Sequence, residues 1–175
     1  MHFRKLTPAD SPLYRKVRLE CLLTFPDNFG STYEEESSQH ELKFEKILRE
    51  VDPNSFLAGA FDGDSLIGLC GFYREGRKKT RHRGEIVQMY IHPDYANKSL
   101  GTGLLKYTIE KALENPEVEQ LILSLVLQNE KAGRVYEKLG FREYGRLTNY
   151  FKSGTQYWDQ RFMVLHRADV NEGSI

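Results

Sequence analysis

A short glycine-containing loop separates a strand-like segment from a helix-like segment near the middle of the chain. Residues 85–91 form an apolar run typical of a strand, and His92-Pro93 ends it. The loop then contains Lys98, Ser99, Gly101 and Gly103. Apolar residues recur at helical spacing over 100–113. A strand, a glycine-containing loop and a helix start together present several backbone N–H groups to one ligand, so the segment predicts a phosphate site.

Two other phosphate-binding patterns do not fit this loop. No Gly-x-Gly-x-x-Gly motif follows the first predicted strand, which argues against a dinucleotide site. The chain also contains no Gly-Lys-Ser/Thr triplet, so it has no P-loop.

Periodicity and turn signals predict the element order β-α-α-β-β-β-α-β-α-β-β. Strands are expected over 2–6, 56–61, 66–73, 85–91, 121–127, 141–147 and 157–165. Helices are expected from Thr7-Pro8, from Ser31 or Thr32 to Val51, over 100–113 and after Asn129. The crossover around the loop requires the 85–91 and 121–127 strands to be parallel. The continuously apolar 121–127 run predicts a strand buried on both faces.

Length and composition predict one soluble domain. We expect it to span residues 1–167, followed by a frayed C-terminal tail over 168–175. Lys+Arg and Asp+Glu are both 25, so no large basic field is expected, which argues against nucleic acid as a partner. Cys21 and Cys70 do not have the spacing of a zinc or disulfide framework. The N-terminus lacks a signal-peptide pattern, and no apolar run approaches the ~18 residues of a membrane span. We therefore expect a cytoplasmic protein.

Two segments resemble motifs of the GNAT N-acetyltransferase superfamily. Residues 96–101, Ala-Asn-Lys-Ser-Leu-Gly, are similar to its acyl-CoA pyrophosphate loop, Gln/Arg-x-x-Gly-x-Gly/Ala, although Ala96 and Ser99 depart from two of the three signature positions. Residues 129–141 resemble Asn-x-x-Ala-x-x-x-Tyr-x-x-x-Gly-Phe and fit every specified position. The order of the predicted strands and helices also resembles that of the superfamily, over roughly residues 3 to 166.

The resemblance implies an α/β (α+β) GNAT-like fold. Its mixed sheet has about seven strands flanked by about four helices, and the parallel fourth and fifth strands splay apart. It also implies an enzyme that moves an acetyl group from acetyl-CoA to a primary amine in a ternary complex, without a metal. A small cationic amine is the expected acceptor. A protein amine and a non-catalytic acyl-CoA-binding module are the alternatives, and a homodimer is left open.

Two residues are candidates for proton transfer. In the family the tyrosine at the position of Tyr136 protonates the coenzyme A thiolate; the alternative is a core aromatic on an amphipathic helix. Glu85 is the candidate base, because related protein-lysine acetyltransferases carry a catalytic glutamate at a similar offset from the loop. The alternatives are an ion pair of Glu85 with Arg81 or Arg83 and proton removal through water.

The resemblance also assigns the coenzyme site. Backbone groups of Met89, Tyr90 and Ile91 are expected to contact the pantetheine arm, and Asn129 to cap a helix or contact the same arm. The expected pyrophosphate contacts are Asn97, Lys98, Ser99, Leu100, Gly101, Thr102 and Gly103. Ala96 and Ser99 are expected to weaken coenzyme binding without abolishing it, since the backbone amides remain and Ser99 can cap the helix.

Other features are less specific. Glu34, Glu35 and Glu36 either form an acidic acceptor wall or complement a helix N-terminus. The acceptor site is expected near Phe29–Ser31 and within 144–158, where strand packing is the alternative for the aromatic residues Tyr144, Tyr150, Tyr157 and Trp158. The turn over 74–83 holds six Lys or Arg and is either a solvated loop or a contact for a phosphate group.

Overall fold

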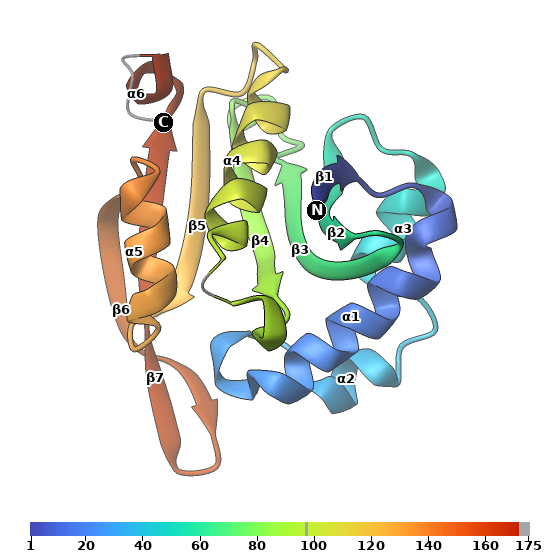
Figure 1. The fold of residues 1–175 in the computed structure, drawn as a ribbon. Coiled ribbons are helices and arrows are strands. Elements are labelled where there is room, and N and C mark those ends of the chain that lie inside the picture. Colours follow the sequence, from blue (N-terminus) through green and yellow to red (C-terminus); the bar gives the residue numbers. More distant parts are fainter. Residues whose placement is uncertain (97, 172–175) are drawn as a thin grey trace.

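A computed structural model describes residues 1–96 and 98–171, and its framework is one seven-stranded sheet (Figure 1). The strands are β1 (His2–Lys5), β2 (Ser55–Asp62), β3 (Ser65–Arg74), β4 (Arg83–Ile91), β5 (Gln120–Val126), β6 (Arg142–Ser153) and β7 (Gln156–His166). Their order is β1-β2-β3-β4-β5-β7-β6. Only the β4–β5 pairing in this sheet is parallel. The predicted mixed sheet with parallel fourth and fifth strands is therefore confirmed.

Helices cover both faces of the sheet. They are α1 (Ser11–Thr24), α2 (Tyr33–Ser37), α3 (Lys43–Glu50), α4 (Leu100–Leu113), α5 (Glu130–Lys138) and α6 (Arg167–Asn171), with 3-10 turns η1 (Pro8–Asp10), η2 (Pro26–Asn28) and η3 (Pro93–Tyr95). Buried residues of α1 and α3 form one core cluster with β2 and β3. Buried residues of α4 and α5 form a second cluster on the opposite face. The two faces are called the α1 face and the α4 face below.

The strand expected over 141–147 continues to Ser153 as β6, and two predicted helical boundaries also differ from the structure. The helix expected up to Val51 is two helices, because Leu42 leaves helical geometry (φ −79°, ψ 156°) to enter the core and acts as the N-cap of α3. The tail expected over 168–175 begins instead with α6, whose Val170 packs against the core. Arg167 ties α6 down by donating hydrogen bonds to the carbonyls of Leu113, Asn115 and Val118. Residues 172–175 lie outside the described residues.

A bulge in β4 controls which side chains face each side of the sheet. The β3–β4 register shifts between Leu69 and Gly71, and Gln88 in the bulge has φ +54°. Before the bulge Val87 packs in the α1-face cluster, whereas after it Tyr90 does so and Met89 packs with the α4-face cluster. The bulge therefore reverses which residues of β4 face the α1 side and which face the α4 side, just before the glycine-containing loop.

The parallel strands β4 and β5 pair only at their beginnings. Their ladder ends at the Glu85–Ile122 pair, and the strands then separate (Figure 1). In β5, Leu121, Leu123 and Leu125 are buried, whereas Ile122 and Ser124 on the other face are only partly buried. Val126 on that face is buried, so the prediction that β5 is buried on both faces is wrong only at Ile122 and Ser124, where the sheet opens.

Candidate active site

The gap between β4 and β5 is part of a cavity of about 940 Å³. Residues of both faces line it: Glu85 and Tyr90 from the α1 face, and Met89, Ile91 and Tyr136 from the α4 face. The splayed strands therefore leave a passage through the sheet, in which ligands entering from opposite faces can meet.

The N-terminus of α4 borders one end of this cavity. Leu100, Gly101 and Thr102 occupy the first three helical positions, and all three line the cavity. Amides at these positions have no partner within the helix, whereas the Gly103 N–H already donates to the Ser99 carbonyl at 3.0 Å. The first turn of α4 thus offers N–H groups and a positive helix end to an anion.

Ser99 has the backbone conformation that glycine adopts easily. It is the N-cap of α4 with φ +57°, and its side chain makes no capping hydrogen bond. The expected side-chain cap is therefore absent, while the residue lines the cavity. The serine keeps the turn at some cost in strain, so this departure from the family motif leaves the path of the backbone intact.

Two other residues assigned to the coenzyme loop, Gly103 and Lys98, lie outside the cavity lining. Gly103 does not line the cavity; a Cβ atom on it would lie 2.7 Å from the Phe3 ring, so this glycine lets α4 approach β1. The Lys98 ammonium lies 5.0 Å from the centre of the Tyr95 ring and is not part of the cavity lining. Asn97 lies outside the described residues.

Asn129 caps a helix, as expected, and it also lines the cavity. Its side-chain oxygen accepts a hydrogen bond from the Ala132 N–H at 3.2 Å, which caps α5, and the residue also lines the cavity. Lys131, in the first turn of α5, lines the cavity as well and was not expected from the sequence. It adds a positive charge on the α4 face.

Tyr136 is part of the α4-face wall of the cavity. It is 7% exposed, lines the cavity and packs edge-to-face with Phe141, whose ring centre is 6.1 Å away. Burial raises the pKa of the Tyr136 phenol, so it keeps its proton throughout the neutral range. Tyr136 is therefore both a core aromatic and a cavity residue, and the two interpretations of the sequence are compatible.

Glu85 lies on the α1-face side with Tyr73 and Lys43 around it. Tyr73 is its cross-strand partner and donates a hydrogen bond to the Glu85 carboxylate, and the Lys43 ammonium lies 3.4 Å from the centre of the Tyr73 ring. Burial raises the pKa of Glu85, and the Lys43 charge partly opposes this effect. Neither Arg81 nor Arg83 pairs with it, because these arginines contact Glu117 and Glu75.

The acceptor-side wall differs from expectation. Phe29, Gly30 and Ser31 line the cavity as expected, but the last hairpin contributes Phe151 and Gln160. The expected tyrosines of that hairpin, Tyr144, Tyr150 and Tyr157, are exposed, and with Trp158 they lie outside the cavity lining.

The three glutamates of α2 do not form an acidic wall. Glu36 is buried in an ion pair with Arg18, Glu35 accepts a hydrogen bond from the Thr32 N–H to cap α2, and Glu34 is exposed. None of the three lines the cavity. Arg18 does line it, and its place on the helix was visible in the sequence, four residues after Tyr14 on the buried face of α1.

The basic turn lies at the other end of β4 from the α4 N-terminus. Arg74 and Arg81 are both paired with Glu117, at 2.6 and 3.0 Å. This pairing and position fit the solvated-loop interpretation better than a phosphate contact.

Among the described residues, no His, Cys, Asp and Glu side chains are grouped to hold a metal ion. No helix within 1–96 and 98–171 is long and apolar enough to cross a membrane.

Known proteins resemble this chain in sequence and fold. The model of the acetyltransferase (GNAT) family matches residues 19–141. Human N-alpha-acetyltransferase 30 is 26% identical over 152 residues, 86% of this chain but only 41% of that protein, so the chain spans less than half of this relative. The spermidine N(1)-acetyltransferase of Thermoplasma acidophilum is 25% identical over 148 residues, 81% of this chain and 88% of that protein. A solved GNAT-family acetyltransferase from Streptococcus pneumoniae has a TM-score of 0.79 at 23% identity, covering 94% of this chain and 98% of that one.

Proposed function

The chain belongs to the GNAT acetyltransferase family, and we propose that it transfers an acetyl group from acetyl-CoA to a primary amine in a ternary complex. One observation carries the proposal: a single cavity connects the N-terminus of α4, the Tyr136 phenol and the Glu85 carboxylate through the opening between β4 and β5. Helix N–H groups that can bind an anion, a phenol and a carboxylate thus share one cavity.

The residues at the α4 end fit the coenzyme. Leu100, Gly101 and Thr102 offer backbone N–H groups to its pyrophosphate, and Ser99 maintains the required turn. Beyond the Glu85–Ile122 pair, β5 no longer pairs with β4, so the edge of β4 over Met89–Ile91 is free to bind the amide groups of the pantetheine arm. When bound, acetyl-CoA supplies the acetyl group as a reactive thioester.

Glu85 is the proposed base. Alkyl amines have a pKa near ~10.4, so the acceptor arrives protonated and must lose a proton before it attacks. Burial raises the pKa of Glu85, which makes its carboxylate a stronger base than that of an exposed glutamate. The hydrogen bond from Tyr73, which also lines the cavity, holds this carboxylate in place.

Tyr136 is the proposed acid. It holds a proton on its phenol oxygen at neutral pH because burial raises its pKa. Among the described residues no hydrogen bond ties down this hydroxyl, so the proton is available to a departing sulfur atom in the cavity. Ala132, one turn earlier in α5, and Asn129, the N-cap of α5, also line the cavity.

The acceptor must be small where it enters. A cavity of about 940 Å³ has to hold the end of the coenzyme as well, which leaves room for a small amine or for the end of a longer chain. We take a small amine as the first candidate. A protein amine is the second, because the relatives include proteins named N-alpha-acetyltransferase 30 as well as spermidine N(1)-acetyltransferases. Of the acidic groups expected to favour a cationic acceptor, Glu34–Glu36 lie outside the cavity lining, whereas Glu85 lines it.

The test is an acceptor screen with purified protein and acetyl-CoA. Thiol release is followed for amines, amino acids, polyamines and short peptides, and acetyl-CoA binding is measured by calorimetry. Amine-dependent thiol release supports the proposal. Acetyl-CoA binding without turnover on any amine would instead indicate a non-catalytic binding module, and no binding at all would refute the donor site.

A further inference from the structure

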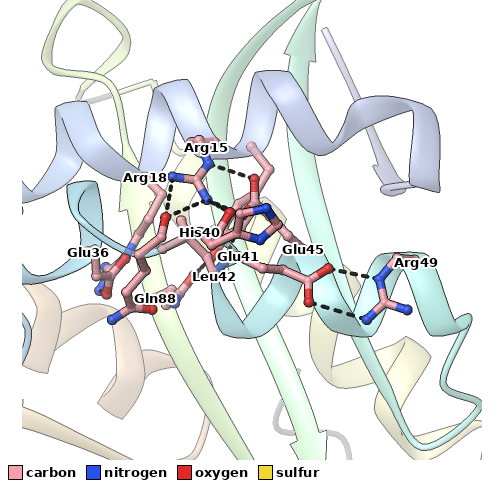
Figure 2. A network of polar contacts seen from close by, with 11 residues as sticks. Arg15, Arg18, Glu36, His40, Glu41, Leu42, Glu45, Arg49 and Gln88 are labelled. Carbon is pink, nitrogen blue, oxygen red and sulfur yellow. Dashed lines mark hydrogen bonds and ion pairs between the residues drawn. The ribbon is translucent and has the colours of Figure 1, made fainter.

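One strained residue in the cavity wall is held by a hydrogen bond from a residue outside the cavity. Gln88 of β4 lines the cavity and has φ +54°, a left-handed conformation that a non-glycine residue adopts only at a cost. Its side-chain oxygen accepts a hydrogen bond at 3.2 Å from the hydroxyl of Tyr14 on α1. Figure 2 shows Gln88 as part of the polar network beneath α1.

Tyr14 is fixed by the core and does not line the cavity. Its side chain is fully buried and packs edge-to-face with Phe44, whose ring centre is 6.3 Å away. Burial raises the pKa of Tyr14, so its hydroxyl keeps the proton that it donates to Gln88. The position of this hydroxyl therefore depends on the core and not on what occupies the cavity.

The bulge at Gln88 changes the course of β4 where the sheet opens. The β3–β4 ladder shifts there, so that Cys70 of β3 lies opposite two residues of β4, Gln88 and Met89. On its other edge β4 has no strand partner at this point, because the pairing with β5 ends at Glu85. A left-handed residue within a strand turns the peptide groups that flank it. The conformation of Gln88 therefore decides which peptide groups of β4 point into the opening.

Peptide N–H groups that point into this opening can take part in acetyl transfer. When the amine nitrogen attacks the thioester, a C–N bond forms, and the carbonyl oxygen carries negative charge until the C–S bond breaks. A fixed N–H group stabilises that charge, and a misplacement of about 1 Å can cost about 10²-fold in rate. Gln88 and Met89 line the same cavity as Glu85 and Tyr136, so the bulge lies in the wall of the space that holds the proposed base and acid.

We propose that Tyr14 is a positioning residue for acetyl transfer. By holding the Gln88 side chain it keeps the bulge in its left-handed conformation, and the bulge directs N–H groups of β4 toward the reacting carbonyl. This role rests on the proposed function, because it concerns the rate of that reaction. A residue of the core thus sets the turnover rate without touching either substrate.

The first test is Tyr14→Phe, which removes the hydroxyl and keeps the ring in the core. It should lower kcat by roughly 10- to 100-fold, up to the lower end of what losing one oxyanion donor costs. The factor should be the same for every acceptor amine, because the change acts on the thioester and not on the acceptor. Acetyl-CoA affinity, measured by calorimetry, should change by less than about threefold, since the first turn of α4 is unaltered.

Val17→Ala is the control for lost packing. Val17 lies one turn further along α1 in the same core cluster as Tyr14, and it does not line the cavity. This variant should be less stable than wild type in denaturant unfolding, because it leaves a cavity in the core. Its kcat should stay at the wild-type value.

Gln88→Gly tests whether the hydrogen bond acts through the bulge. Glycine adopts φ +54° without help, so in the Gln88→Gly background Tyr14→Phe should change kcat by less than about twofold. Asn149→Gly is the control background, because it also replaces a left-handed residue of a strand but lies outside the cavity lining. In that background Tyr14→Phe should keep its full effect on kcat.

Hydrogen exchange gives a readout that does not require activity. The amides of residues 87–91 should exchange faster in Tyr14→Phe than in wild type, and Val17→Ala should not show this change. Gln88→Met removes the acceptor of the same hydrogen bond, so it supplies an independent arm if Tyr14→Phe does not fold. It should lower kcat by a similar factor.

Four results would overturn the role of Tyr14 while leaving the proposed acetyl transfer intact. They are unchanged exchange over 87–91, an unchanged kcat in Tyr14→Phe, a loss that differs between acceptors, and an equal loss in the Gln88→Gly background. Wild-type protein that acetylates no amine would refute the proposed function and, with it, this role of Tyr14.

Discussion

Tyr73 lies directly opposite Glu85 in the β3–β4 ladder, and its hydroxyl donates a hydrogen bond to the Glu85 carboxylate. The pairing sits one step before Ile86, where β4 and β5 begin to separate. The carboxylate is thereby held at the entrance to the opening in the sheet, and Lys43 approaches it across the Tyr73 ring. This arrangement makes the ionisation of Glu85 the first property to test.

Replacing Glu85 with glutamine should remove the acidic limb of the pH profile of kcat/KM. Burial raises the pKa of Glu85, so in wild-type protein the active carboxylate forms only as the pH rises above the range of an ordinary glutamate. The variant should also lose about 10²- to 10⁴-fold in kcat/KM near neutral pH. Glu75→Gln, which changes a carboxylate outside the cavity lining, is the control. An acidic limb that survives in Glu85→Gln would show that water removes the proton instead.

Replacing Lys43 with methionine should move this acidic limb to higher pH. The positive charge of Lys43 lowers the pKa of Glu85, so its removal lets the effect of burial act without opposition. The shift should be small, because the lysine is partly exposed and its field is screened by solvent. The matched control is Lys46→Met, one turn along α3 and outside the cavity lining. A shift to lower pH in Lys43→Met would contradict the assignment.

Replacing Tyr136 with phenylalanine should lower kcat by about 10²-fold or more while acetyl-CoA affinity stays nearly constant. The ring remains and keeps its contact with Phe141, but the proton for the departing sulfur is lost. Tyr107→Phe on α4, outside the cavity lining, controls for the loss of a phenol. Steady-state kinetics and calorimetry separate the two effects. An unchanged kcat would assign Tyr136 to the core alone.

Replacing Ser99 with glycine should stabilise the protein by about 0.5–1 kcal/mol. A left-handed conformation costs a non-glycine residue roughly 1–2 kcal/mol, and glycine removes this strain. Glycine also has more conformational freedom in the unfolded chain, which offsets part of the stabilisation. Gly63→Ala is the reciprocal control, because Gly63 also has φ +57° and its Cβ would meet nothing within 4 Å. Denaturant unfolding should show the two changes with opposite signs. A less stable Ser99→Gly variant would mean that the serine side chain makes a contact in solution that outweighs the strain.

The sequence predicted what depends on local pattern. Strand and helix periodicity placed β4, α4, β5 and α5. The family resemblance pointed to Tyr136 and Glu85, and both line the cavity. The part of the acceptor wall outside Phe29–Ser31 could not be predicted in this way. It depends on the bulge at Gln88, which reverses the facing of β4, and on the break at Leu42, which separates α2 from α3. Both are responses to packing between distant segments, and no local propensity encodes them.

Gly101 and Gly103, both in the first turn of α4, are constrained by different neighbours. A Cβ atom on Gly101 would lie 3.5 Å from the Met89 side chain, an ordinary contact within the cavity wall. A Cβ atom on Gly103 would lie 2.7 Å from the Phe3 ring, so that ring would have to move. The first glycine therefore leaves room for a ligand, and the second leaves room for β1.

Alanine at each position should separate these roles. Each alanine should add about 0.8–1 kcal/mol of helix propensity, so the difference between the unfolding free energies of the two variants reports the clash with Phe3. Gly103→Ala should be less stable than Gly101→Ala by about 1–2 kcal/mol in denaturant unfolding.

Acetyl-CoA affinity should be affected in the opposite order. Gly101→Ala should weaken it roughly tenfold, about 1.4 kcal/mol, because a methyl group enters the cavity where the coenzyme approaches the backbone. Gly103→Ala should bind acetyl-CoA as wild type does, since its N–H is already bonded to Ser99 and its Cβ points away toward Phe3. Weaker acetyl-CoA binding in Gly103→Ala alone would move the pyrophosphate site one turn further into α4 than the cavity indicates.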